Sequence, residues 1–280
     1  MSNPDSGRAP RLPTPLGACD THMHIYEPGY PIRPGASAPG QSATLARYRA
    51  VQRRLGLSRT VIVQPGGYGT DNRCTLAAMA ELGDAARGVA IVDPDAPDAD
   101  IERLAKLGMR GLRYHMMRAA VLPWESLPRM AARVAPFGWH VQLQCESREL
   151  SARAAALASL PCDLVIDHIG RFHPPLAPDD RNWRALRRLL DGGRCWVKLS
   201  APYHGSKSGP PRYEDAGALA RELIAAAPER MLWASNWPHP SFKSGFPDEA
   251  DLLDCVADWA PGEAARLKIL VANPAKLYGF

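Results

Sequence analysis

The chain has 280 residues, of which 46% are hydrophobic and 22% are charged, so a wholly disordered, collagen-like or coiled-coil protein is excluded. The net charge of +5 is a small excess of 34 Lys and Arg over 29 Asp and Glu, and the densest basic cluster, from Arg181 to Arg188, has helical spacing. We therefore expect a solvated helix face and no nucleic-acid partner, whereas a modest positive charge suits a small anionic substrate.

Residues 1–17 are predicted to form a Pro-rich N-terminal leader, followed by one barrel domain over residues 18–280. The leader lacks the apolar segment of a secretory signal, and no segment approaches the ~20 apolar residues that span a membrane. The six cysteines include no CxxC pair, and disulfides would be unusual in a chain of this size without a signal. These features predict a cytoplasmic protein without membrane contact, and they leave the oligomeric state open.

Eight short apolar segments, bounded by Gly, Pro or charged residues, are predicted to be β-strands. Their nearly continuous apolar character is typical of strands that are covered on both faces. The predicted strands are Ala18–Asp20, Thr60–Gln64, Gly88–Val92, Gly111–Tyr114, His140–Gln144, Leu164–Asp167, Cys195–Leu199 and Met231–Ala234.

Amphipathic segments between the strands are predicted to be helices. Eight strands that alternate with eight helices indicate the α/β class and a single-domain (β/α)8 TIM barrel. A doubly wound sheet is less favoured because no GxGxxG motif follows a strand. The predicted helices are Ala43–Leu55, Asp71–Ala85, Asp98–Leu107, Trp124–Ala135, Ser147–Ala158, Asn182–Leu190, Tyr213–Ala226 and Asp248–Trp259.

Polar residues follow several predicted strands, at the carboxyl ends where the active sites of such barrels lie. His22 and His24 form an HxH pair after the first strand, and a period of two places both imidazoles on one side. His168 follows the sixth strand and Asn236 follows the eighth. We predict that these four residues carry the chemistry.

Arg113 and Arg171, at the ends of the fourth and sixth strands, are predicted to bind a carboxylate of the substrate. Arginine suits this task because its guanidinium binds carboxylates through two parallel hydrogen bonds. A structural ion pair is the alternative for each. Weaker candidates for substrate binding are Gln144, Lys198, Tyr203 and His239.

Several other features can be interpreted from the sequence. Strand alternation predicts that Asp167 faces away from the site and orients a neighbour. Asp71 and Asn72 are expected to cap a helix, with substrate contact near the loop after the second strand as the alternative. Tyr278 and Phe280 are expected to pack the C-terminal segment, and Pro28–Gly40 is predicted to be a long loop at the catalytic face.

Nine motifs, spread in order from the first strand to the C-terminus, carry a family resemblance. They are CDTHMH (19–24), GTDNRCTL (69–76), GVAIVDPD (88–95), GMRGLRY (108–114), GWHV (138–141), VIDHIGR (165–171), WVKLSAP (196–202), SNWPHP (235–240) and NPAKLYGF (273–280). Through them the chain resembles the amidohydrolase superfamily, in the branch that contains 2-pyrone-4,6-dicarboxylate lactonase and galactarolactone isomerase. The resemblance implies a barrel enzyme that acts on lactones.

Asn236 departs from the pattern of that family. Amidohydrolases generally carry Asp here, in the motif SDWPH, and this Asp takes the proton from the attacking water. A neutral amide cannot act as a general base, although it can hold a substrate through hydrogen bonds. The galactarolactone isomerase branch is similar to this chain in having Asn at the position.

The replacement of the family's Asp by Asn236 also affects whether the site can bind a metal ion. Zinc hydrolases of the superfamily combine the HxH pair with the histidine of strand six and the Asp of strand eight, and Asn236 removes that anionic ligand. A site made of His22, His24 and His168 stays open. Resemblance to metal-independent lactone enzymes favours no metal and no cofactor.

Three functions remain in competition. The favoured one is intramolecular isomerisation of a δ-lactone to a γ-lactone on a sugar diacid. The second is hydrolysis of a lactone such as 2-pyrone-4,6-dicarboxylate, with a histidine replacing the missing Asp as base. The third is a barrel that binds an acidic ligand without catalysis.

Overall fold

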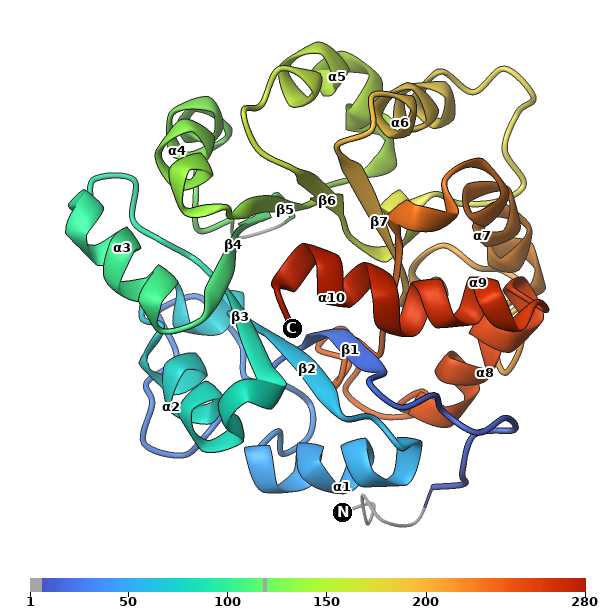
Figure 1. Cartoon of the computed structure of the whole chain (residues 1–280), viewed down its shortest axis with the longest axis horizontal. Helices are drawn as coiled ribbons and strands as arrows, with labels where there is room; N and C mark the ends of the chain where they lie inside the picture. Colours follow the sequence, from blue (N-terminus) through green and yellow to red (C-terminus); the bar gives the residue numbers. More distant parts are fainter. Residues whose placement is uncertain (1–6, 118–119) are drawn as a thin grey trace.

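A computed structural model describes residues 7–117 and 120–280 of the chain. Eight parallel strands follow one another around a barrel in the order of the sequence (Figure 1). The strands are β1 (Cys19–Met23), β2 (Arg59–Val63), β3 (Ala86–Ala90), β4 (Met109–His115), β5 (His140–Gln144), β6 (Leu164–Ile166), β7 (Cys195–Ser200) and β8 (Met231–Ala234).

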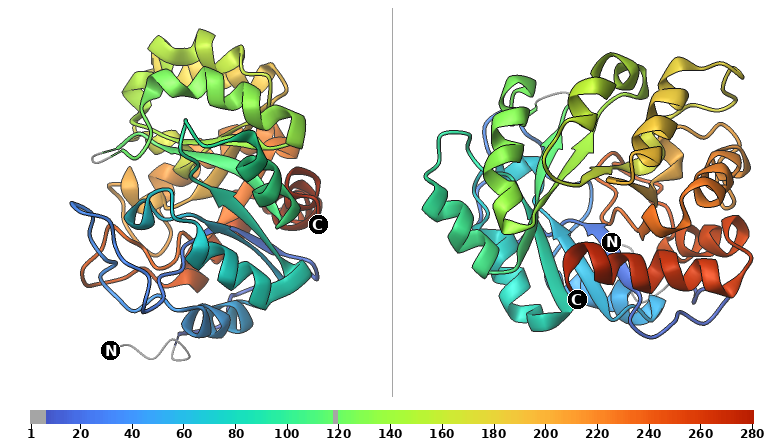
Figure 2. Two further views of the ribbon diagram at one scale, coloured as in Figure 1. Left: turned by 90° about the vertical axis from the view of Figure 1, so that its left-hand side faces the viewer. Right: turned by 45° about the horizontal axis from the view of Figure 1, so that its top comes forward.

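Helices surround the strands on the outside of the barrel, as the two further views in Figure 2 also show. One helix follows each strand, and two more end the chain. The helices are α1 (Leu45–Leu55), α2 (Arg73–Leu82), α3 (Asp98–Lys106), α4 (Leu127–Val134), α5 (Leu150–Ala158), α6 (Arg181–Asp191), α7 (Glu214–Ala226), α8 (Glu249–Trp259), α9 (Glu263–Leu267) and α10 (Asn273–Tyr278).

Two backbone hydrogen bonds join the first and last strands at their carboxyl ends. The N–H of Asn236 donates to the carbonyl of His22, and the N–H of His24 donates to the carbonyl of Trp237, each at 2.9 Å. The predicted single-domain (β/α)8 barrel is therefore confirmed. These bonds also bring Asn236 beside the HxH pair.

The predicted strands and helices are all present, with ends that differ by a few residues. Strand β3 begins at Ala86 and β4 at Met109, each two residues before the predicted start, because Arg87 and Arg110 interrupt the apolar segments. Their long side chains reach the end of the barrel from the first residues of the strands. The Arg87 guanidinium, for example, lies 4.9 Å from the centre of the Phe280 ring.

Helix α10 lies across the amino-terminal ends of the strands and forms a floor (Figure 1). Tyr278 is fully buried there, against Val61, Val165 and Leu232 inside the barrel. The expected packing of the C-terminal segment is thus confirmed, but α9 and α10 were not predicted as helices. With one end of the barrel sealed, the opposite, carboxyl end is left as the mouth.

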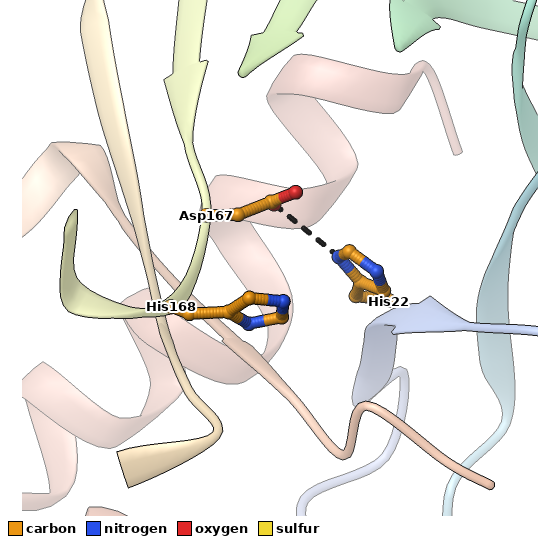
Figure 3. Close-up of side chains that lie close together, drawn as sticks. All are labelled: His22, Asp167 and His168. Carbon is orange, nitrogen blue, oxygen red and sulfur yellow. Dashed lines mark hydrogen bonds and ion pairs between the residues drawn. The ribbon is translucent and has the colours of Figure 1, made fainter. Parts of the chain in front are cut away.

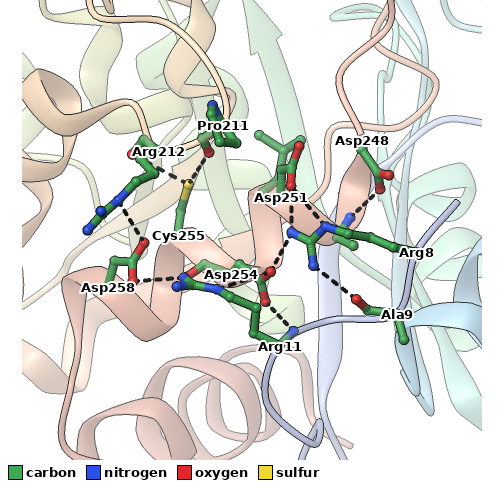
Figure 4. A network of polar contacts seen from close by, with 12 residues as sticks. Arg8, Ala9, Arg11, Pro211, Arg212, Asp248, Asp251, Asp254, Cys255 and Asp258 are labelled. Atoms are coloured by element: carbon green, nitrogen blue, oxygen red, sulfur yellow. Dashed lines mark hydrogen bonds and ion pairs between the residues drawn. The ribbon is translucent and has the colours of Figure 1, made fainter.

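Residues 7–17 of the predicted leader run along α8 (Figure 4). The guanidinium of Arg8 lies 2.5 Å from the Asp254 carboxylate, and that of Arg11 lies 2.7 Å from Asp258. Residues 1–6 of the predicted leader lie outside the described residues. In the part of the chain that the structure describes, no helix is both long and apolar enough to cross a bilayer.

Candidate active site

Three histidines, His22, His24 and His168, lie together at the mouth. Figure 3 shows two of them, His22 and His168, with Asp167. The rings of His22 and His24 have their centres 4.9 Å apart, and those of His22 and His168 are also 4.9 Å apart. All three side chains are almost fully buried. The HxH pair comes from β1, whereas His168 follows β6, so the barrel brings together residues that are far apart in the sequence.

Asp167 also faces this cluster, which corrects the expectation that it points away. Its Oδ1 lies 3.2 Å from Nδ1 of His22 (Figure 3). Alternation along β6 turns Val165 into the barrel and therefore Asp167 as well. His168 reaches the same site only because its backbone adopts a left-handed φ of 56°, a conformation that the strand pattern does not predict. The second half of the expectation agrees with the structure, since Asp167 orients His22.

Lys198 and Gln142 hold Asp167 from inside the barrel. The Lys198 ammonium donates to Gln142 Oε1 and to the Thr21 carbonyl, each at 2.7 Å, and lies 3.7 Å from Asp167. Gln142 Nε2 donates to the other Asp167 oxygen at 3.0 Å. Lys198 is fully buried and supports Asp167 in this structure, while its contact with a substrate stays a prediction. Gln142 was missed, although a glutamine within an apolar strand could have signalled it.

The histidines are held in their neutral forms. Burial lowers the pKa of His22, His24 and His168 well below the ordinary value, and the charge of Lys198 acts in the same direction on His22. Nδ1 of His24 donates to the Val63 carbonyl at 2.7 Å, which leaves its Nε2 as an acceptor 3.2 Å from Nε2 of His22. A proton added to this pair can be stabilised by Asp167 on the far side of His22.

His168 presents a different arrangement. Its Nδ1 is hydrogen-bonded to Oγ of Ser200 at 2.9 Å. No partner for its Nε2 is found among residues 7–117 and 120–280, so this nitrogen is the one left for a ligand.

Asn236, Tyr203 and His239 form one group at the mouth. Nδ2 of Asn236 donates to the Tyr203 hydroxyl at 2.8 Å, and that hydroxyl lies 3.1 Å from Nδ1 of His239. Asn236 and His239 are buried, whereas Tyr203 is partly exposed. The structure thus brings together three residues that were predicted separately.

The two arginines differ. Arg113 is buried beside the histidines, where its charge lowers the pKa of His24, and one of its NH groups donates to the Gln64 carbonyl at 2.6 Å. Its Nε is buried and finds no partner among the described residues, which also place no carboxylate within ion-pair distance. Arg171, in contrast, lies 3.5 Å from the Glu146 carboxylate, the structural ion pair that we left open.

Three further predicted residues can be placed. Gln144 ends β5 and is buried, level with His115 on β4. Asn72 does not cap α2 with its side chain, which instead donates to the carbonyls of Thr70 and Ile91 and ties the loop after β2 to the end of β3. Asp71 does accept a hydrogen bond from the N–H of Arg73, at the start of that helix.

The donors at the mouth fit a metal ion poorly. Among the described residues, His22, Asp167 and His168 offer ligand atoms within 4.8 Å of one another. The same Asp167 oxygen is already shared between His22 and the Lys198 ammonium, and Arg113 brings a second cation to the site. Zinc is held either with anionic ligands or by three imidazoles. Asn236 adds no charge, and the Nε2 atoms of His22 and His24 already contact each other at 3.2 Å.

The chain matches the amidohydrolase family over residues 19–280, and it belongs to that family. It is similar to the D-galactarolactone isomerase of Agrobacterium fabrum, at 36% identity over 277 residues that cover 98% of this chain and 94% of the relative. It is also similar to the 2-pyrone-4,6-dicarboxylate hydrolase of Comamonas testosteroni, at 33% identity over 96% of this chain and 92% of the relative. A solved apo structure from Agrobacterium tumefaciens superposes with a TM-score of 0.90 at 35% identity, and covers 97% of this chain and 99% of the other.

Proposed function

We propose that this protein is a metal-independent lactone enzyme that converts a carboxylated δ-lactone into a γ-lactone without adding water. The observation that carries the proposal is Asn236, an amide that occupies the position after β8, beside three histidines and one buried carboxylate. Without a carboxylate at that position, the site has no strong base directed at a water molecule. The similarity to a D-galactarolactone isomerase supports the same reaction.

Arg113 would bind the carboxylate of the substrate. Its guanidinium is buried, its Nε lacks a partner among the described residues, and no described carboxylate lies within ion-pair distance of it. A buried cation of this kind favours an anionic ligand strongly, because it gains charge-assisted hydrogen bonds that the protein alone does not supply. The substrate we propose is therefore the lactone of a sugar diacid.

His168 would polarise the lactone carbonyl, and the His22–His24 pair would move the proton. Nε2 of His168 is free to donate to the carbonyl oxygen, where negative charge develops. His24 would accept the proton of the incoming hydroxyl, and Asp167 would stabilise the added charge through His22. The same proton then returns to the ring oxygen that leaves, so the proton balance of the reaction is zero.

A hydroxyl of the substrate itself would be the nucleophile. A hydroxyl held near the carbonyl reacts intramolecularly, with effective molarities of about 10⁵ to 10⁸ M, so it needs a weaker base than water does. Asn236 would hold that hydroxyl by a hydrogen bond. One ring closes as the other opens.

The test is to incubate the purified protein with D-galactarolactone, 2-pyrone-4,6-dicarboxylate and 4-sulfomuconolactone and to follow the products by proton NMR. We expect a new ring from the first compound and no solvent oxygen-18 in the product. Metal analysis and chelator treatment accompany the assay, and full activity in metal-free protein is expected. An open-chain product that carries the label would contradict isomerisation.

Hydrolysis of a lactone is the second candidate, supported by the similarity to a 2-pyrone-4,6-dicarboxylate hydrolase. Asn236→Asp separates the two, because it introduces the missing base and should raise the rate of lactone hydrolysis. No gain in a folded variant that still binds substrate would count against our mechanism. A third candidate, a barrel that binds acids without turnover, predicts thermal stabilisation by these lactones with no product.

A further inference from the structure

A chain of hydrogen bonds leads from Asn236 through the barrel wall to helix α8. Asn236 Nδ2 contacts the Tyr203 hydroxyl at 2.8 Å, which contacts His239 Nδ1 at 3.1 Å, and His239 Nε2 contacts Glu249 Oε1 at 3.2 Å. The other Glu249 oxygen pairs with the Arg54 guanidinium. His239 is fully buried and Glu249 is 7% exposed, so water competes little for the bond between them, whereas Tyr203 is partly exposed.

The direction of each hydrogen bond follows from the charged end of the chain. Burial alone would raise the pKa of Glu249, but the hydrogen bond from His239 and the charge of Arg54 bring it below the ordinary value, so Glu249 is ionised and can only accept. His239 then donates from Nε2, and in the neutral imidazole Nδ1 is the acceptor for the Tyr203 hydroxyl. Tyr203, having used its proton, accepts from Asn236 Nδ2.

We propose that Tyr203, His239 and Glu249 are positioning residues that lock the amide of Asn236 in one orientation. With Nδ2 committed to Tyr203, Oδ1 is the atom left for the ligand, so Asn236 presents a hydrogen-bond acceptor to the mouth. That acceptor would receive a hydrogen bond from the substrate hydroxyl and so aim the hydroxyl oxygen at the carbonyl, while the proton itself passes to His24. This inference rests on the proposed isomerisation for its role in catalysis, but not for the orientation itself.

The backbone conformation of Asn236 and His239 also holds their side chains in place. Asn236 and His239 have φ of 58° and 59°, and the N–H of His239 donates to the Asn236 carbonyl at 2.8 Å, so the two residues form one tight turn. Asparagine tolerates this left-handed region better than most residues, whereas histidine does so less readily. The turn places both side chains on Tyr203, which follows a different strand.

The orientation makes a specific prediction for Asn236→Asp. The new carboxylate cannot donate, so the Tyr203 hydroxyl must turn its proton toward it, and His239 Nδ1 loses its donor. His239 then needs a proton on Nδ1 as well, which Glu249 stabilises as an imidazolium. One substitution at the mouth should therefore charge a buried histidine that it does not contact.

The first test reads the protonation of His239 directly by nitrogen-15 NMR of the ring nitrogens, with the signals assigned through His239→Gln. In the unliganded wild-type protein we expect Nε2 protonated and Nδ1 unprotonated, and in Asn236→Asp both nitrogens protonated. A protonated Nδ1 in the wild type, or a neutral His239 in the variant, would overturn the proposal. This result does not depend on any activity, so it stands apart from the test of the proposed function.

The second test uses Tyr203→Phe with D-galactarolactone as the probe. Misorientation of a group by about 1 Å can cost roughly 100-fold in rate, so we expect kcat to fall by about that factor while KM changes little. Tyr114→Phe is the matched control, because it removes a buried hydroxyl whose one hydrogen-bond partner among the described residues is Ser126. Ser126 is not part of the hydrogen-bond chain from Asn236 to Glu249. An equal loss in both variants, or a loss expressed in KM alone, would overturn the positioning role.

A double substitution completes the test. In the Asn236→Asp background, Tyr203 no longer sets the orientation of an amide, so Tyr203→Phe should have a much smaller effect on product formation than in the wild type. Equal effects in the two backgrounds would show that Tyr203 acts independently of Asn236, and would refute the proposal that Tyr203 orients the Asn236 amide.

Discussion

The two ends of the barrel differ in which residues adopt a left-handed backbone conformation. At the amino end, where helices lead into strands, the left-handed residues are glycines such as Gly56, Gly138 and Gly193. At the carboxyl end, after β6, β7 and β8, glycines such as Gly170 are joined in the left-handed region by residues that carry side chains, and these include His168, Arg171, Ala201, Asn236 and His239. A left-handed residue with a Cβ costs about 1–2 kcal/mol, so the mouth accepts strain that the floor avoids. Residues with a Cβ thus adopt an unfavourable backbone conformation where their side chains must point into the candidate site.

The interiors of the two ends differ as well. The floor is filled by Val61, Val165, Leu232 and Tyr278, whereas the mouth buries ionisable groups, among them Asp167 and Lys198. Burial of apolar surface stabilises a fold, while buried charges need partners and do not by themselves add stability. We therefore expect substitutions at the mouth to reduce activity and substitutions at the floor to reduce stability.

The largest effect is expected for Asp167→Asn. The amide cannot stabilise a proton on His22, so kcat should fall by about 10²- to 10⁴-fold, the range of a lost general acid–base function. Asp163→Asn is the control near the floor, because this carboxylate accepts only a Trp196 N–H, at 2.9 Å, and the amide oxygen can replace it. Steady-state kinetics with D-galactarolactone would measure both, and comparable losses would erase the distinction between the two ends.

Leu232→Ala tests the floor. Leu232 is fully buried inside the barrel, and replacing a buried leucine by alanine costs about 3 kcal/mol in the free energy of unfolding. Urea unfolding would measure the loss, with kcat/KM of the folded enzyme unchanged. The exposed Leu267, at 41% exposure, provides a matched control for which we expect almost no change. A large loss of activity in Leu232→Ala without a loss of stability would contradict the expectation that the floor contributes to stability and not to activity.

Arg113→Gln removes the buried cation of the mouth. Hydrogen bonds to charged groups are worth about 1.5–3 kcal/mol, so KM for a carboxylated lactone should rise by roughly 10- to 100-fold. Arg110→Gln is the control on the same strand, because that guanidinium donates to the carbonyls of Ala105 and Met109, toward the floor. An unchanged KM in Arg113→Gln would refute its role in binding the substrate.

The pH profile should report Lys198. Burial lowers the pKa of this ammonium from 10.5 to about 8, so kcat/KM should decline as the pH rises above 8 and Asp167 loses its partner. Between the two values the unfolded chain binds more protons than the folded one, so the contribution of Lys198 to the free energy of unfolding increases with pH over that same window. Activity and stability should thus change in opposite directions, and a parallel decline would contradict the assignment.

The smallest effects concern the backbone. Ala201→Gly should stabilise the protein by up to about 1 kcal/mol because it relieves a left-handed alanine at the mouth. Gly138→Ala should destabilise it by about the same amount, since the added Cβ meets no atom within 4 Å and only the φ of 69° opposes it. Denaturant titrations would measure both. If both substitutions changed the free energy of unfolding in the same direction, the proposed difference in backbone strain between the two ends would be contradicted.

Much of the site was predictable because its residues follow strands. The HxH pair, His168 and Asn236 could be placed at one mouth once eight strands had been recognised, since the carboxyl ends of parallel strands converge. The orientation of Asp167 was predicted wrongly because we assumed that strand alternation directs His168 into the site. In the structure, alternation directs Asp167 into the site, and His168 reaches it through a left-handed backbone conformation. The support that Lys198 gives to Asp167 was not predicted, because a lysine in an apolar strand shows no sign of how deep in the barrel it lies.

The sequence by itself determined the barrel, the family and the exchange of a carboxylate for an amide at Asn236, because periodicity and short motifs are local properties of the chain. Only the tertiary structure decided which groups touch. It brought Tyr203, His239 and Glu249 from three segments to the amide of Asn236, and it placed the Lys198 ammonium beneath Asp167. Such contacts depend on left-handed turns and on the closure of the sheet, which no local pattern of residues encodes.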